Sequence, residues 1–200
     1  MIHNQNHKKL VLIELNEINF KYLKKYISQH PKELKNFTKY FESHNEYVTS
    51  SEADYSNLEP WIQWVSAHTG MEFEKHKIFR LGEIVNFNYE QIFEKIEKKG
   101  YKVGCISPMN SKNNLKDPTY FIPDPWTETS SSNDFWSRSL KDLIVQTVND
   151  NAQAKISVKS ILILLLALVR FSRLNTYPLL LKLAITSKKK KWNKALFLDI

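Results

Sequence analysis

Two short apolar runs, separated by helical segments, constrain the fold of this chain most. Leu10–Leu15 is apolar except for Glu14, which is typical of a strand that a parallel sheet buries on both faces. The second run, residues 101–107, follows a predicted helix over Glu90–Lys99 that Gly100 ends. Strand, helix and strand in this order predict an α/β fold whose largely parallel central sheet is flanked by helices.

Two amphipathic helices are predicted between the first strand and Ser51. Asn19 is a suitable N-cap for the first helix, and His30-Pro31 ends it, because the residue before a proline avoids the helical conformation. Tyr47–Ser51 is a candidate short strand. The apolar residues of the two helices recur at helical spacing, namely Phe20, Leu23 and Ile27 in the first and Leu34, Phe37 and Phe41 in the second.

The composition of the chain changes after residue 116. Asp117–Asn133 is rich in Pro, Thr and Ser and is predicted to be a long ordered loop. From Asp134 onward, apolar residues at helical spacing dominate, which indicates a mostly helical C-terminal region. We therefore expect an α/β part over residues 1–133, followed by a helical cap or insertion with a basic tail over residues 134–200.

The net charge of +8 is concentrated at the end of the chain. Residues 1–154 carry 19 Lys and Arg against 20 Asp and Glu, whereas residues 155–200 carry 10 against Asp199 alone. Because the charge belongs to one tail, it does not favour nucleic-acid binding, and no nucleic-acid partner is predicted. Lys188–Lys191 indicate either a solvated tail or a weak contact with an anionic membrane.

Two features bear on the compartment of the protein. The single cysteine, Cys105, excludes an intrachain disulfide, and the N-terminal apolar run is too short for a signal peptide, so we expect a cytoplasmic protein. The longest apolar run of the tail, Ile161–Val169, has nine residues. A spanning helix needs about 20 apolar residues, so no transmembrane span is predicted.

Leu58–Gly82 carries the one pattern that indicates a reaction class. Pro60 fits the first turn of a tryptophan-bearing helix that Gly70 ends, and His76-Lys77-Ile78-Phe79 follows six residues later. Together with Thr69-Gly70, this order resembles the signature of the alkaline-phosphatase superfamily, in the branch of type I phosphodiesterases and sulfatase-like hydrolases. The resemblance covers residues 8–110 and implies hydrolysis of phosphate or sulfate esters with a divalent metal, Zn or Mn.

Two positions that carry the chemistry in that superfamily are altered in this chain. The resemblance implies a metal-binding Asp at the end of the first strand, where this chain has Asn16 followed by Glu17, and these two residues are our candidate metal ligands. An Asn oxygen brings no negative charge, so we expect a reduced metal affinity. The resemblance also implies a nucleophile nine positions before Thr69, where this chain has Pro60. Since Ser56 is the nearest hydroxyl upstream, no catalytic residue is assigned.

The remaining metal ligands of the superfamily are Asp-His pairs and a further His later in the chain. Here the last histidine is His76, and Asp199 is the only carboxylate after Asp150. We therefore expect the N-terminal portion of a hydrolase-like fold with an incomplete sheet. An open sheet edge and exposed apolar surface would then promote self-association of the chain. His68 and His76 are expected to have structural roles.

Two functions follow from these features. The first is a truncated or catalytically impaired metal-dependent ester hydrolase, acting on a phosphate or sulfate ester of a glycan, nucleotide or lipid headgroup. The alternative is a non-catalytic binding or scaffold protein on the same α/β frame, at a membrane surface or in glycan or envelope metabolism. That protein would use the aromatic segment Tyr120–Trp126 and the basic helices to contact its partner.

Overall fold

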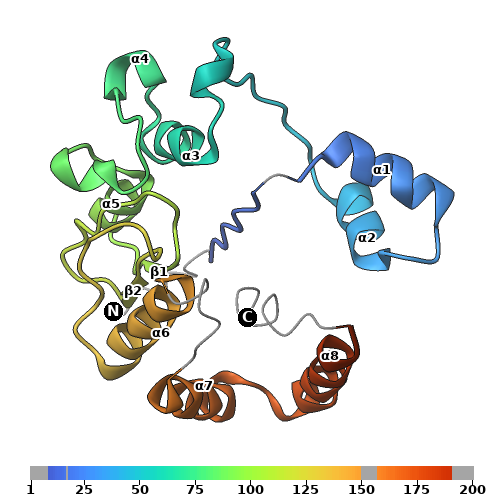
Figure 1. Ribbon diagram of the computed structural model, residues 1–200. Helices are drawn as coiled ribbons and strands as arrows, with labels where there is room; N and C mark the ends of the chain where they lie inside the picture. Colours follow the sequence, from blue (N-terminus) through green and yellow to red (C-terminus); the bar gives the residue numbers. More distant parts are fainter. Residues whose placement is uncertain (1–8, 17, 150–156, 191–200) are drawn as a thin grey trace, which may run out of the picture. The chain divides into compact units, whose positions relative to one another are not determined.

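The computed structural model of the chain describes residues 9–16, 18–149 and 157–190 (Figure 1). The chain divides into two compact units, Met1–Ser51 and Glu52–Ile200. The second unit has an α/β fold, in which helices flank a small two-stranded parallel sheet and a mostly helical region follows. This architecture confirms the predicted fold class. The boundary expected at residue 133, between an α/β part and a helical cap, stays a prediction.

Where the structure describes it, the first unit contains two helices, α1 (Phe20–Gln29) and α2 (Lys35–Ser43), close to their predicted positions. The Asn19 side chain caps α1 by accepting a hydrogen bond from the N–H of Tyr22 at 2.9 Å. The rings of Phe20 and Phe41 meet edge to face at 5.9 Å and join the two helices. Capping and helical spacing are local signals, which is why the sequence predicts both helices.

The two strands predicted for the first unit are wrong. Leu10–Leu15 and Tyr47–Ser51 form no strand, and Leu10, Val11, Tyr47 and Val48 are all exposed. A strand needs a neighbouring strand to bond its backbone groups and a cover for its apolar faces. In the described residues, the only strand pairing joins two segments of the second unit. The apolar composition of Leu10–Leu15 therefore indicated residues that favour burial, but it did not indicate whether a neighbouring strand is available to pair with them.

The sheet consists of β1 (Gly104–Ile106) and β2 (Tyr120–Ile122), which run parallel with Cys105 opposite Phe121. Helix α5 (Ile92–Lys98) packs on the sheet, and Phe93, Val103, Cys105 and Phe121 form a buried cluster there. Both α5 and β1 lie within their predicted segments. By contrast, β2 lies in the segment that was predicted to be a loop. The strand was missed because its three residues stand among Pro and Thr and because its pairing partner lies outside that segment.

Helix α3 (Pro60–Thr69) begins and ends where the sequence predicts. Pro60 occupies its first turn, and Gly70 ends it with a positive φ of 73°. The short helix α4 (Phe73–His76) and two 3-10 turns, η1 (Tyr55–Asn57) and η2 (Glu83–Asn86), lie on either side of α3 in the chain. Val65, Ile78 and Ile84 form a second buried cluster, which joins α3 to η2.

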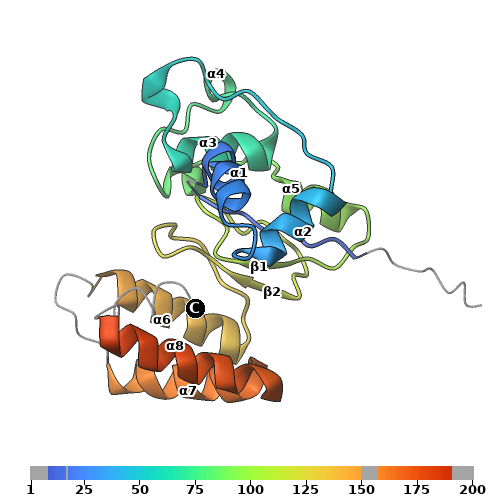
Figure 2. The same ribbon diagram turned by 90° about the vertical axis from the view of Figure 1, so that its right-hand side faces the viewer.

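The described residues of the C-terminal region form three helices and one 3-10 turn: α6 (Phe135–Asn149), α7 (Val158–Phe171), η3 (Leu174–Thr176) and α8 (Tyr177–Lys190). Helix α6 packs on β2 and on α7, as both views of the molecule show (Figures 1 and 2). The rings of Trp136 on α6 and Phe171 on α7 meet at 5.1 Å. None of the helices in the described ranges is long and apolar enough to cross a membrane.

Gly82 occupies a position that should not tolerate a side chain. Its φ is +79°, and an added Cβ would come within 2.6 Å of the carbonyl oxygen of Trp126. We expect Gly82→Ala to lower the free energy of unfolding by about 2–3 kcal/mol, measured by urea denaturation. Gly100→Ala is the matched control, because Gly100 has a φ of +85° with no atom within 4 Å of an added Cβ. That control should cost about 1 kcal/mol, and equal losses in the two variants would contradict the steric argument.

Candidate functional site at the carboxyl edge of the sheet

Polar side chains gather where the two parallel strands end. The segments that leave β1 and β2 at their carboxyl ends carry Asn110 and Asp124, and the N–H of Asn110 donates to Oδ2 of Asp124 at 2.8 Å. In open α/β sheets, ligands bind beside the carboxyl ends of the strands. This edge of the sheet is therefore the candidate functional site of the second unit.

Asp124 organises the turn that follows β2. Its Oδ1 accepts hydrogen bonds from the N–H groups of Trp126 (2.8 Å) and Thr127 (2.9 Å). Its Oδ2 accepts the hydroxyl of Thr127 at 2.6 Å in addition to the N–H of Asn110. With four donors on a buried carboxylate, Asp124 is fully engaged within the protein. It shapes the loop and offers no free oxygen to a ligand.

Asn110 ties the sheet edge to helix α3. Its side-chain amide donates to the carbonyl of Trp61, in the first turn of α3, at 3.0 Å, and to that of Arg80 at 3.3 Å. Its side-chain oxygen accepts the N–H of Gly82 at 2.9 Å. Asn110 is fully buried with a φ of 49°, a left-handed conformation that Asn adopts more readily than most residues. The first turn of α3 is therefore held at the carboxyl end of β1.

That first turn contains no hydroxyl side chain. Glu59 is the N-cap residue, its side chain makes no capping bond, and Pro60 follows as the first helical residue. Ser56, the nearest upstream hydroxyl, lies exposed in η1, where its N–H donates to the Asp54 carboxylate at 2.9 Å. The side chains of Glu59 and Pro60 cannot play the part of a serine or threonine nucleophile.

Ser66 and His76 form a serine–histidine pair whose hydrogen bonding opposes nucleophilic chemistry. Nδ1 of His76 accepts the N–H of Ile78 at 3.0 Å, so in the neutral ring Nε2 carries the proton and donates to Ser66 Oγ, 3.0 Å away. Burial lowers the pKa of His76 below its ordinary value of 6.5, partly offset by the Glu52 carboxylate, and favours this neutral ring. A general base would have to accept the serine proton at that nitrogen. The pair is therefore structural.

A second serine–histidine pair is buried in the core. Ser111 Oγ lies 2.8 Å from Nδ1 of His68, and both residues are buried. The His68 ring stacks on Trp64 at 5.7 Å and lies 5.1 Å from the ring of Phe93. This pair joins α3 to the loop after β1. A substrate has no access to its buried hydroxyl. Both histidines have the structural roles expected from the sequence.

The residues predicted to hold a metal belong to the first unit. Asn16 lies in an exposed turn after the Leu10–Leu15 run, and Glu17 lies outside the described residues. No three His, Cys, Asp or Glu side chains come together in the described ranges. A zinc site needs three or four such donors, so the described part of the chain supplies no donor set for the implied metal. The metal-binding role of Asn16 and Glu17 stays a prediction.

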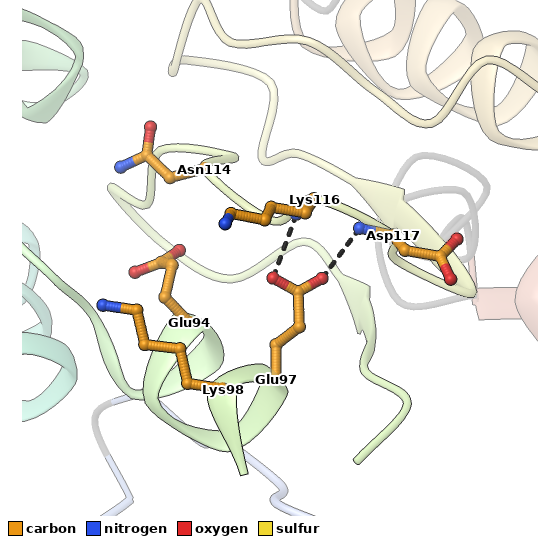
Figure 3. Close-up of a pocket in the computed structure, with 6 residues that line it drawn as sticks. All are labelled: Glu94, Glu97, Lys98, Asn114, Lys116 and Asp117. Carbon is orange, nitrogen blue, oxygen red and sulfur yellow. Dashed lines mark hydrogen bonds between the residues drawn. The ribbon is translucent and has the colours of Figure 1, made fainter. Parts of the chain in front are cut away.

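A shallow pocket of about 240 Å³ lies between α5 and the loop that leads to β2 (Figure 3). The Glu97 carboxylate, which lines this pocket, accepts hydrogen bonds from the N–H groups of Lys116 (3.0 Å) and Asp117 (2.8 Å), and these bonds lower its pKa. Both of its oxygens are therefore already bonded to the loop. The sequence did not predict this contact, because about twenty residues separate the Glu97 carboxylate from the N–H groups that donate to it. The lining residues carry both signs of charge and are Glu94, Glu97, Lys98, Asn114, Lys116 and Asp117.

Glu94 and Glu97, both on α5, should shift protein stability with pH in opposite directions. Burial raises the pKa of Glu94, so its contribution to stability is full below its ordinary pKa of 4.5 and is lost as pH rises through the folded value. The backbone bonds lower the pKa of Glu97, so its contribution is present above 4.5 and is lost as pH falls.

Urea denaturation of Glu94→Gln and Glu97→Gln at pH 3 and pH 7 measures this difference. Relative to the unchanged protein, Glu94→Gln should gain stability on going to pH 7, whereas Glu97→Gln should lose it. Gln at position 94 keeps an acceptor for the N–H of Gln91, so the capping box of α5 is retained. Changes of the same sign in the two variants would contradict the assignment.

The side chains of the tail lysines that were predicted to contact a membrane, Lys188–Lys191, are not described by the structure. Lys191 lies outside the described residues, as do the side chains of Lys188–Lys190. The aromatic segment predicted to contact a partner is largely core, since Phe121 and Ile122 are buried and only Tyr120 and Trp126 are exposed. No protein-family model, no curated protein and no solved structure matches the chain.

Proposed function

We propose that the chain has the frame of an alkaline-phosphatase-superfamily hydrolase, of the phosphodiesterase or sulfatase-like kind, with impaired ester hydrolysis. One observation carries this proposal: Asn110 holds the first turn of α3 beside the carboxyl end of β1. A nucleophile at a helix N-terminus in that place would gain from the helix dipole as negative charge develops. Pro60 occupies that turn instead, so the arrangement lacks its reactive group.

Restoring a hydroxyl at this position tests the proposal. Pro60→Thr places a hydroxyl in the first turn of α3, and Pro60→Ala is the matched control that removes the ring alone. With bis-p-nitrophenyl phosphate, p-nitrophenyl phosphate and p-nitrophenyl sulfate, each with Zn²⁺ or Mn²⁺, the unchanged protein and Pro60→Ala should stay at the buffer background. Pro60→Thr should release p-nitrophenol from one of these esters at least roughly tenfold faster than Pro60→Ala, since a nucleophile positioned at the helix N-terminus lowers the barrier without a bound metal.

Two results would count against the proposal. Equal rates for Pro60→Thr and Pro60→Ala would remove its support. Metal-dependent turnover by the unchanged protein that Asn16→Ala abolishes would show a working site and contradict the impairment.

The second candidate is a non-catalytic binding or scaffold protein on the same frame. This function is favoured by the hydrogen bonds at the sheet edge. The side chains of Asp124 and Asn110 bond to the protein's own backbone and to the Thr127 hydroxyl. Equal and inert Pro60 variants that keep the stability of the unchanged protein would favour this function. The cytoplasmic location and the self-association expected from the sequence stay predictions under either function.

A further inference from the structure

Helix α7 has two opposite faces that carry apolar residues, and among the described residues of the second unit only one of these faces is covered. Ser160, Ile163 and Ala167 are buried, and Ser160 bonds to Gln146 of α6, so this face packs against α6. The opposite face carries a stripe at spacings of three and four residues, which lies along one side of a helix. The stripe consists of Val158, Leu162, Leu165 and Val169, which are 54–74% exposed.

The exposed apolar surface extends beyond this stripe. Ile161 and Leu166 flank it on α7 and are also exposed. Further along the chain, Leu174, Leu179, Leu181 and Ile185 are exposed as well. Single exposed apolar residues are ordinary, but a continuous row along a helix marks an interaction surface.

The segment that contains the stripe carries charge of one sign. The sequence contains no Asp or Glu from residue 151 to residue 198. Lys159 and Arg170 are exposed on α7 and stand eleven positions apart, which is three helical turns, so both lie on the same flank of the stripe. Arg173 and Lys182 add exposed positive charge after α7. Such a surface is complementary to an anionic one.

From this arrangement we infer that α7 binds the surface of an anionic lipid bilayer. The stripe from Val158 to Val169 enters the boundary between headgroups and acyl chains, while Lys159 and Arg170 stay at the level of the headgroups. A helix with one apolar face, a basic flank and too few residues to span a bilayer lies in the plane of the interface. The inference is independent of ester hydrolysis, since it uses none of the residues at the sheet edge.

Flotation of the full chain with lipid vesicles in a density gradient tests this inference, because protein aggregates sink and do not float. We expect the chain to float with vesicles of phosphatidylcholine and phosphatidylglycerol at 70:30 and to bind pure phosphatidylcholine at least roughly tenfold more weakly. Each Lys or Arg near an anionic surface strengthens binding roughly fivefold. Raising the salt concentration to 0.5 M should release most of the anionic component, because the Debye length shortens.

Two double variants separate the apolar and the charged contributions. Leu165→Glu with Val169→Glu should lower binding to the anionic vesicles at least roughly tenfold, and Lys159→Glu with Arg170→Glu should lower it by a similar factor. Val48→Glu is the control for an added carboxylate, since Val48 is 88% exposed and lies in the other unit. It should reduce binding much less than either double variant. Far-UV circular dichroism should show unchanged helix content in every variant, because all the altered side chains are exposed.

Three results would overturn the inference. The first is equal binding to the two vesicle types, and the second is unchanged binding of the Leu165→Glu, Val169→Glu variant. The third is a dimer in size-exclusion chromatography that this variant dissociates, while the unchanged protein fails to float. That last result would show that a second copy of the chain covers the stripe.

Discussion

Replacing Asp124 with alanine is expected to lower the free energy of unfolding by about 4–5 kcal/mol, since each buried donor left without a partner costs about 1–3 kcal/mol. Asp124 is 2% exposed and accepts hydrogen bonds from three backbone N–H groups and from the Thr127 hydroxyl. Alanine removes the acceptor of all four donors, and the donors on Asn110 and Thr127 belong to buried residues. The loss should approach the whole stability of a small domain.

Urea denaturation followed by tryptophan fluorescence measures this loss, and two further variants make it interpretable. Asp124→Asn keeps one acceptor oxygen, so it should cost roughly half as much and should stay folded if Asp124→Ala does not. Asp117→Ala is the surface control, because Asp117 is exposed and its ion pair with Lys102 should contribute at most about 1 kcal/mol. A loss for either Asp124 variant no greater than that of Asp117→Ala would contradict the role assigned to this carboxylate.

Replacing Asn110 with alanine is expected to lower the free energy of unfolding by about 3–4 kcal/mol, through lost hydrogen bonds and added backbone strain. The side chain bonds to the backbone of Trp61, Arg80 and Gly82. Those three groups lie far from Asn110 in the sequence, so their loss should loosen α3 from the sheet edge. The positive φ of Asn110 adds a penalty for any residue with a Cβ that has no compensating local bond.

Asn110→Gly separates the two contributions to this loss. Glycine removes the same three hydrogen bonds and tolerates the left-handed conformation, so it should be more stable than Asn110→Ala by about 1 kcal/mol. Asn114→Ala, in the same loop, has no such anchoring role and should cost less than about 0.5 kcal/mol. If Asn110→Ala were no less stable than Asn114→Ala, the anchoring role of Asn110 would be wrong.

The stability variants also bear on the proposed function. If Asn110 fixes the first turn of α3, then Asn110→Ala combined with Pro60→Thr should lose the turnover gained by Pro60→Thr alone, because a displaced nucleophile loses its orientation. Comparing the two proteins at a urea concentration where both remain folded separates a positioning effect from unfolding.

Helices were the part of the fold that sequence reasoning predicted well. Asn19 and Pro60 mark helix starts, and Gly70 and Gly100 stand at helix ends, because capping, proline and positive φ act within a few residues of the chain. Asn16 and Pro60, which depart from the pattern that the sequence resembles, could also be identified from the sequence. Whether Asn16 binds a metal stays a prediction, whereas the place of Pro60 in the first turn of α3 is confirmed.

Strands and the site network depended on contacts between distant segments. Leu10–Leu15 has the composition of a buried strand and forms none, while Tyr120–Ile122 lies in a segment that resembles a loop and pairs with β1. Asn110 and Asp124 stand 14 residues apart, and Asn110 reaches 49 residues back to Trp61. No local pattern marks either residue as an anchor.

The amino-acid sequence by itself therefore predicted most of the helices, the cap at Asn19 and the place of Pro60 in the first turn of α3, since each of these depends on neighbouring residues. The tertiary structure alone decided which apolar runs pair as strands and which polar side chains are consumed in holding the sheet edge. It also decided which face of α7 packs against α6. These outcomes depend on free energies of burial and hydrogen bonding between segments, which become defined only once the chain has folded.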